Sequence, residues 1–156
     1  MYKILKAEKL AANIFLMDVE APRVAKHCLP GQFVIVKMDE EGERIPLTIC
    51  DYDAEKGIVT IVFQPIGAST MKMAELQAGD SFEDFVGPLG KPSEFTEMDL
   101  DELKKKRIVF VAGGVGTAPV YPQVKWLHEH GITADAIVGA KTKDLVILEE
   151  GNEQGM

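Results

Sequence analysis

Cysteine is scarce in this chain of 156 residues, which contains only Cys28 and Cys50. The two are not spaced like the ligands of a zinc site or like a redox-active pair, so neither kind of site is predicted. We expect both to be small, buried, reduced thiols. No apolar run approaches the roughly 20 residues that span a bilayer, and the N-terminus lacks the long apolar core of a signal peptide. A cytoplasmic protein without a membrane partner is therefore the expectation.

Positive charge is also in short supply, with 17 Lys and Arg against 25 Asp and Glu and a net charge of −8. Because nucleic-acid binding relies on Lys and Arg contacts with phosphates, this balance argues against a nucleic-acid partner. The 46% of hydrophobic residues is ordinary for a globular protein. The length permits one ordinary domain or two small ones.

Up to residue 98 the chain contains short apolar segments separated by turn residues. The strongest candidate strand is IVTIVFQ, in which β-branched residues predominate. The segment GPLGKP is predicted to be irregular because of its glycines and prolines. Strands spaced this evenly indicate an antiparallel barrel or sandwich. We predict strands over residues 2–9, 13–20, 32–38, 44–52, 58–64 and 81–86, with short helices over 22–28 and 69–76.

A strand, a glycine-rich loop and a helix follow from residue 108. The apolar strand 108–112 leads into VAGGVGTAP, where Thr117 is a suitable N-cap and Pro119 fits the first helical turn. A helix N-terminus after glycines suits a pyrophosphate. The pattern is not G-x-G-x-x-G, so a tight turn without a ligand is an equally good interpretation. Apolar side chains then recur on one helix face, which a glycine ends: Val120, Val124, Leu127 and Gly131.

The charged stretch 94–107 separates these two parts, and we place a domain boundary after residue 98. A second apolar strand over 134–140 and a helix over 143–150 continue the second part, which reads as the beginning of a doubly wound parallel sheet. His128 and His130 fall at the end of the preceding helix, where positive charge is favourable, and we favour that role over catalysis. No acid–base pair stands out, so no catalytic residue is predicted.

Four motifs occur in a specific order along the chain: GERIPLTI, GASTMK, VGPLG and VAGGVGTAP. This order resembles the ferredoxin–NADP reductase superfamily. Within it, the chain is similar to the small flavin subunits of multisubunit oxidoreductases. These include the alpha subunit of NADH-dependent ferredoxin–NADP reductase, also called the sulfide dehydrogenase beta subunit, and the dihydroorotate dehydrogenase electron-transfer subunit. The resemblance covers essentially the whole chain.

The resemblance implies a six-stranded antiparallel FAD-binding barrel over residues 1–98. An incomplete Rossmann-like NAD(P)-binding α/β domain would follow over 99–156. Arg44 would pair with the FAD pyrophosphate, because a guanidinium is bidentate toward phosphate. Superfamily members often carry an aromatic residue where this chain has Pro46, so flavin contact here would be apolar. The implied FAD residues are Arg44, Pro46, Leu47, Thr48, Phe63, Gln64, Gly67, Ser69 and Thr70.

The residues themselves leave other interpretations open at these positions. A surface arginine beside Glu43 is an equally good interpretation of Arg44, and an ordinary core residue is the alternative for Phe63. The Gly67, Ser69 and Thr70 group is also what ordinary helix capping requires. Cys50 follows the flavin motif, although a buried thiol is the preferred interpretation.

By the same resemblance, the glycine loop would bind NAD(H) or NADP(H). The implied residues are Gly113, Gly114, Val115, Gly116, Thr117 and Pro119. Lys141 and Lys143 could meet a 2′-phosphate, but solvated loop lysines are the preferred interpretation. Full-length relatives continue beyond this length and hold a 2Fe-2S cluster there. We therefore expect a truncated chain without that cluster and with poor nicotinamide affinity.

The implied function is a flavin-binding electron-transfer subunit of a multisubunit oxidoreductase. Hydride would move between NAD(P)H and FAD, and electrons would pass on to iron–sulfur centres of a larger partner subunit, with ferredoxin as a further possible partner. An alternative is a related electron-transfer subunit of dihydroorotate dehydrogenase or of a hydrogenase. A different class of alternative is a barrel that has lost its flavin and acts as a docking module.

Overall fold

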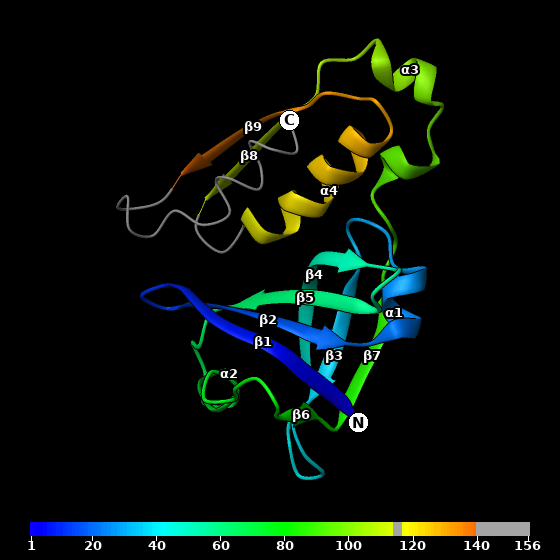
Figure 1. Cartoon of the computed structure of the whole chain (residues 1–156). Helices are drawn as coiled ribbons and strands as arrows, with labels where there is room; N and C mark the ends of the chain where they lie inside the picture. The colour runs from blue at the N-terminus through cyan, green and yellow to red at the C-terminus, as the bar shows by residue number, and fades with distance from the viewer. Residues whose placement is uncertain (114–116, 140–156) are drawn as a thin grey trace.

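A computed structural model describes residues 1–113 and 117–139 of the chain. It contains a seven-stranded antiparallel sheet followed by a smaller unit with two parallel strands (Figure 1). Several predictions lie outside the described residues: the helix over 143–150, and the roles of Gly114, Val115, Gly116, Lys141 and Lys143. No helix among the described residues is long and apolar enough to cross a membrane.

The first sheet curls into a nearly closed barrel, which confirms the predicted fold class. Its strand order is β6-β1-β2-β5-β4-β3-β7. Two short helices, α1 and α2, are close to the segments predicted for them. The barrel elements are β1 (Tyr2–Ala11), β2 (Ile14–Glu20), α1 (Pro22–His27), β3 (Phe33–Lys37), β4 (Ile45–Asp53), β5 (Ile58–Phe63), α2 (Ala68–Met73), β6 (Ser81–Phe82) and β7 (Asp84–Leu89).

The strand predicted over 81–86 is in fact two strands, which raises the count from six to seven. β6 pairs with β1, whereas β7 pairs with β3, at the opposite edge of the sheet. Only Glu83 separates them. One continuous stretch therefore passes from one edge of the sheet to the other and brings the barrel close to closure.

The prediction that GPLGKP is irregular was wrong for its first half, because β7 continues to Leu89. In the pairing with β3, Ile35 lies opposite Val86 and Phe33 opposite Leu89, so β7 carries one extra residue. Such a bulge accommodates a proline that cannot donate to the sheet. A Cβ on Gly87 would come within 2.8 Å of Val34 Cγ1, which explains the need for glycine there.

Alternation along the barrel strands explains the core. In β5, Val59 and Ile61 face the interior and are fully buried, as is Phe82 of β6. Inward-facing aliphatic side chains from β1 to β5 join them in one cluster, and α1 adds Val24 and Ala25 to it. A strand with one buried face and one outer face requires this period of two.

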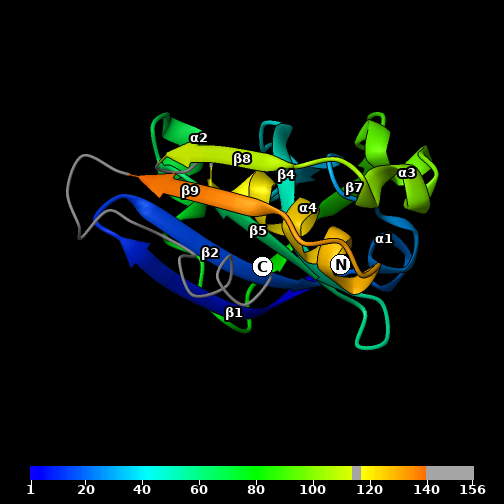
Figure 2. The same ribbon diagram turned by 90° about the horizontal axis from the view of Figure 1, so that it is seen from above.

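The α/β unit follows a connector that contains η1 (Glu94–Glu97) and α3 (Leu100–Lys104). β8 (Val109–Gly113) pairs in parallel with β9 (Asp135–Gly139), and α4 (Thr117–Glu129) joins them, as predicted. Thr117 is the first helical residue of α4 rather than its N-cap. α4 lies between the β8–β9 sheet and the barrel in Figure 1, and Figure 2 shows the same stacking from above.

Candidate functional site

The outer face of β4 carries the residues predicted to meet a flavin. Ile45 and Ile49 point into the barrel and are buried, whereas Pro46 and Thr48 are exposed on the outside. Leu47 is half-buried and packs against the barrel core, so it differs from its two neighbours in the motif. β4 therefore presents Pro46 and Thr48 as an open surface, while Leu47 offers its backbone.

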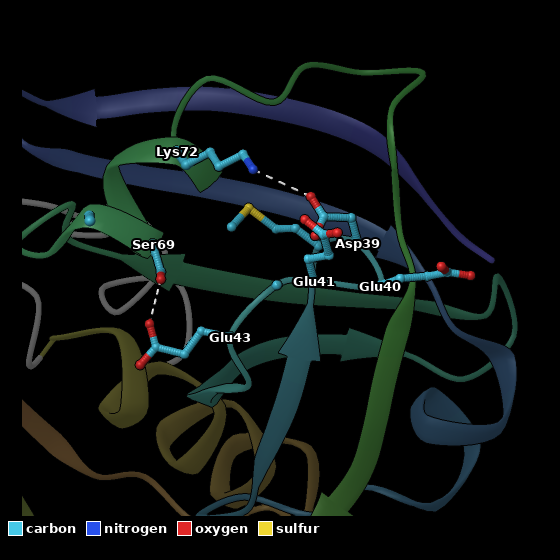
Figure 3. A pocket seen from close by; sticks show the side chains of 9 residues that line it. Asp39, Glu40, Glu41, Glu43, Ser69 and Lys72 are labelled. Carbon is cyan, nitrogen blue, oxygen red and sulfur yellow. Dashed lines mark hydrogen bonds and ion pairs between the residues drawn. The ribbon is translucent and has the colours of Figure 1, made fainter.

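Arg44 lies just before β4 and is exposed, with its guanidinium 3.3 Å from the Asp84 carboxylate. The neighbouring Glu43 accepts a hydrogen bond of 2.5 Å from the Ser69 hydroxyl at the start of α2 (Figure 3). This contact joins two of the predicted diphosphate-binding segments, which are 26 residues apart in the chain. Arg44 and Ser69 thus each have a carboxylate of the protein itself as their present partner.

The start of α2 also shows ordinary helix capping. The Gly67 N–H donates to Thr70 Oγ1 at 3.0 Å, and the Thr70 hydroxyl donates to the Gly67 carbonyl oxygen at 3.1 Å. The capping interpretation of Gly67 and Thr70 is therefore confirmed. Their binding of a diphosphate stays a prediction, which would require Thr70 to exchange these local partners.

An acidic groove adjoins this corner. Met38, Asp39, Glu40, Glu41 and Glu43 line it on one side, and Ala68, Ser69 and Lys72 line it on the other (Figure 3). Lys72 Nζ lies 3.3 Å from Asp39 Oδ2 across the groove. Four carboxylates around one ammonium give the groove a negative balance, so a phosphate would fit on the Arg44 side rather than in the groove.

Phe63 lies in the barrel core, as the structural interpretation of this residue predicted. Its side chain is 3% exposed and stacks on Phe15 of β2, with ring centroids 5.9 Å apart. Gln64 is half-buried just after β5. A flavin contact from Phe63 would have to use its backbone, and a side-chain contact from Gln64 stays a prediction.

The two ends of the predicted nucleotide loop are described by the structure. Gly113 ends β8, and Thr117 begins α4. Pro119 stands in the first turn, and its carbonyl accepts a hydrogen bond of 2.9 Å from Gln123 Nε2. The loop therefore leads from the carboxyl end of a parallel strand to a helix N-terminus, the usual position of ligands in α/β sheets.

A small buried cluster joins the start of α4 to β4. Cys50 of β4, Val62 of β5 and Ala118 of α4 belong to it, with Tyr121 packed against them. Cys50 is two residues beyond Thr48, and Ala118 directly follows Thr117. The first turn of α4 thus packs on the barrel next to the predicted flavin surface.

Both cysteines are buried free thiols, as predicted. Burial raises the pKa of Cys28 to about 12 and also raises the pKa of Cys50 strongly. No group of three or more potential metal ligands occurs among residues 1–113 and 117–139. His130 Nδ1 lies 2.7 Å from the Trp126 carbonyl oxygen, near the end of α4, and its ring stacks on that of Trp126.

One contact between the two units, the ion pair of Lys125 with Asp51, was not predicted from the sequence. Lys125 Nζ of α4 donates to Asp51 Oδ1 of β4 at 2.6 Å and to the Tyr52 carbonyl oxygen at 3.3 Å. These residues are more than 70 positions apart, so no local pattern reveals the pairing.

No protein-family model matches the chain. A Clostridium beijerinckii protein known only by its position in the adh 3′ region is 65% identical over 150 residues, which are 96% of this chain and 51% of that protein. The Thermotoga maritima homolog of the dihydroorotate dehydrogenase B (NAD(+)) electron transfer subunit is 38% identical over 146 residues, 94% of this chain and 49% of the homolog.

The solved NADH-dependent reduced ferredoxin–NADP oxidoreductase, studied for flavin-based electron bifurcation, superposes with a TM-score of 0.89 and 37% identity. The match covers 99% of this chain and 54% of that one. This is the ferredoxin–NADP reductase fold. The resemblance to this superfamily and to electron-transfer subunits is confirmed. The chain spans about half the length of the curated relatives it matches.

Proposed function

We propose that this ferredoxin–NADP reductase-like chain binds FAD on the outer face of its barrel. It would act as part of an electron-transfer subunit in which the flavin exchanges hydride with NAD(H) or NADP(H). One observation carries the proposal. The buried cluster of Cys50, Val62 and Ala118 packs the start of α4 on β4 at Cys50, two residues beyond Thr48. A flavin on β4 and a nicotinamide held by the loop before α4 would then be neighbours, as a direct transfer requires.

The phosphate corner supports FAD as the ligand. Arg44 and Ser69 already hold carboxylates, from Asp84 and Glu43, and a diphosphate presents the same kind of oxygen acceptor. Arginine is suited to this exchange because its planar fork binds two oxygens at once. Pro46 and Thr48, exposed on the same outer face of β4, would contact the rest of the cofactor.

The protein's part in the reaction is to bind and orient. Bound flavin and nicotinamide supply hydride transfer themselves, which agrees with the lack of a predicted acid–base pair. In this proposal, the barrel over 1–98 holds FAD through Arg44, Pro46, Leu47, Thr48, Phe63, Gln64, Gly67, Ser69 and Thr70. The α/β segment over 99–156 holds the nicotinamide nucleotide through Gly113, Gly114, Val115, Gly116, Thr117 and Pro119.

The names of the relatives support a partner subunit. Proteins similar to this chain are named as an electron transfer subunit of dihydroorotate dehydrogenase B or as a homolog of one. We include in the proposal a larger oxidoreductase subunit with iron–sulfur centres as the recipient, with ferredoxin as a further partner. No iron–sulfur ligand set is available from two separate buried cysteines.

The proposal is tested by titrating the purified chain with FAD, using visible absorption and calorimetry. Flavin bands shifted from those of free FAD are the expected result. We predict that Arg44→Ala weakens FAD binding by about 10- to 100-fold, the loss expected for a charged hydrogen bond. Arg23→Ala is the matched control, since Arg23 is an exposed arginine on α1. It should leave the affinity unchanged.

Two outcomes would contradict the proposal. If the wild-type chain showed no FAD binding, the proposed flavin site would be contradicted and the docking-module alternative would be favoured. Equal FAD affinity in Arg44→Ala and the wild type would refute only the assignment of Arg44, not FAD binding by the chain.

A further inference from the structure

The contact between Asp51 and Lys125 depends on an irregularity in β4. Ile49 lies opposite Ile61 of β5, but Asp51 lies opposite Thr60, so β4 carries one extra residue at Cys50. Ile49 faces the core, and strict alternation would send Asp51 there as well. The bulge instead places Asp51 on the outer face. Bulges commonly re-aim a side chain in this way.

Two hydrogen bonds hold the Asp51 carboxylate on the outer face of the barrel. Its Oδ1 accepts the Tyr52 N–H at 2.8 Å and the Lys125 ammonium at 2.6 Å. Lys125 also donates to the Tyr52 carbonyl and lies 5.7 Å from the centroid of the Tyr52 ring. Both side chains are about one-third exposed, so water screens the pair less than it screens an ion pair on the open surface.

The charges agree with this geometry. Burial alone would lower the pKa of Lys125, but its hydrogen bond to Asp51 and the charge of that carboxylate outweigh burial and raise the pKa. The ammonium therefore stays charged in its half-buried position. Burial and the nearby Asp51 also raise the pKa of Tyr121, one turn earlier in α4, so this neighbour stays neutral.

α4 has two contact faces. Leu127 and Trp126 pack with Ile132 and Ala134 of the α/β unit. On another face, Ala118, Tyr121 and Lys125 recur at i, i+3 and i+7 and meet the barrel. Ala118 is small and lies at the start of the helix, so the apolar contact alone would leave α4 free to change its angle to the barrel. A second contact two turns later fixes the direction of the helix.

We propose that Asp51 and Lys125 are positioning residues that hold α4 at a fixed angle on the flavin face of β4. By fixing the helix, they fix its first turn, where Ala118 packs against Cys50, two residues beyond Thr48. The consequence for hydride transfer rests on the proposed function, whereas the fixed angle does not. Neither residue needs to touch a cofactor.

The angle of α4 is measured by electron paramagnetic resonance between two spin labels. One label is attached at Glu20→Cys, at the exposed end of β2, and the other at His128→Cys, at the exposed end of α4. The native thiols do not compete for the label because both are buried. This measurement needs no cofactor, so it decides the proposal whether or not the chain binds FAD.

The wild type should give one narrow distance distribution. Lys125→Met and Asp51→Asn should both broaden it and add longer distances, and the double variant should be no broader than either single one. Lys125→Arg keeps the charge and should restore the narrow distribution. Lys72→Met is the matched control, because it breaks the ion pair with Asp39 on the barrel. Its distribution should equal that of the wild type.

Unchanged distributions in both Lys125→Met and Asp51→Asn would overturn the proposal, even if both variants unfold at lower temperature. Asp51→Asn keeps the size of the side chain, so it serves if Lys125→Met does not fold.

A second readout links the angle to the flavin. Trp126 is the sole tryptophan of the sequence and adjoins Lys125, so energy transfer from it to bound FAD reports the distance between α4 and the flavin. We expect Asp51→Asn to bind FAD as the wild type does but to show less transfer. Lack of FAD binding by the wild type would count against the proposed function alone, since the label distances remain interpretable.

Discussion

In the barrel, inward-facing side chains such as Val19, Val59 and Ile61 are completely inaccessible to water. In the β8–β9 sheet, Val111 is 74% exposed and Ile137 is 59% exposed, although both are as apolar as the barrel residues. The difference lies in how many faces each sheet must cover. A curled antiparallel sheet has one apolar face, which it turns inward. Parallel strands are apolar on both faces.

Within the described residues, α4 packs on one face of the β8–β9 sheet, where Phe110 of β8 lies against the cluster that contains Leu127. The same helix packs on the barrel through Ala118 and Lys125. The barrel therefore supplies its own core. In the described part of the α/β unit, the core combines α4 with Leu103 of α3, and α4 also packs on the barrel. We expect the two regions to differ in stability and to separate at α4.

The largest expected effect comes from the two cores. Ile61 and Leu127 are both fully buried, one in the barrel and one in α4. Truncation to alanine should cost about 2–5 kcal/mol of unfolding free energy in each case. Ile61→Ala should lower hydrogen-exchange protection throughout the barrel. Leu127→Ala should lower it in α4, β8 and β9 and leave the barrel amides protected.

If Leu127→Ala lowered protection in the barrel as much as in α4, the chain would unfold as one cooperative unit. The comparison between the two regions would then fail.

The thiols provide a second, smaller test of the same comparison. Cys28 lies in the barrel core, whereas Cys50 lies under α4 at the boundary between the units. Only a thiolate reacts readily, and burial raises the pKa of Cys28 to about 12 and raises that of Cys50 as well. Both should resist alkylation at pH 8 and react faster as the pH rises toward 12.

In mild denaturant, Cys50 should become reactive before Cys28, because undocking of α4 exposes it while the barrel stays folded. Mass spectrometry of the alkylated chain gives the order. Modification of Cys28 first would reverse the proposed ranking of stability.

The barrel was largely predictable, because alternation in segments such as IVTIVFQ fixes which side faces inward. Features that depend on distant partners were not. The extension of β7 through Gly87 and Pro88 follows from pairing with β3, which overrides the local preference of these residues. The bulge at Cys50 and the partner of Asp51 likewise depend on β5 and α4.

The candidate site shows the same division. Motif resemblance singled out Arg44 and Ser69, but neither spacing nor composition placed them together. The structure links their segments through Glu43, the neighbour of Arg44, which accepts a hydrogen bond from the Ser69 hydroxyl 26 positions away. Phe63 shows the converse: the resemblance predicts a flavin contact, whereas the alternative interpretation as an ordinary core residue agrees with its burial.

The smallest expected effect concerns the exposed face of the β8–β9 sheet. Val111→Thr keeps the branched shape and the strand preference of valine. Because Val111 is 74% exposed, the unfolding free energy should change by no more than about 0.5 kcal/mol. Sedimentation should show weaker self-association at high concentration, since an exposed apolar patch tends to associate. A loss of more than about 1 kcal/mol would instead mean that this face is covered in the folded chain, and the contrast with the barrel would disappear.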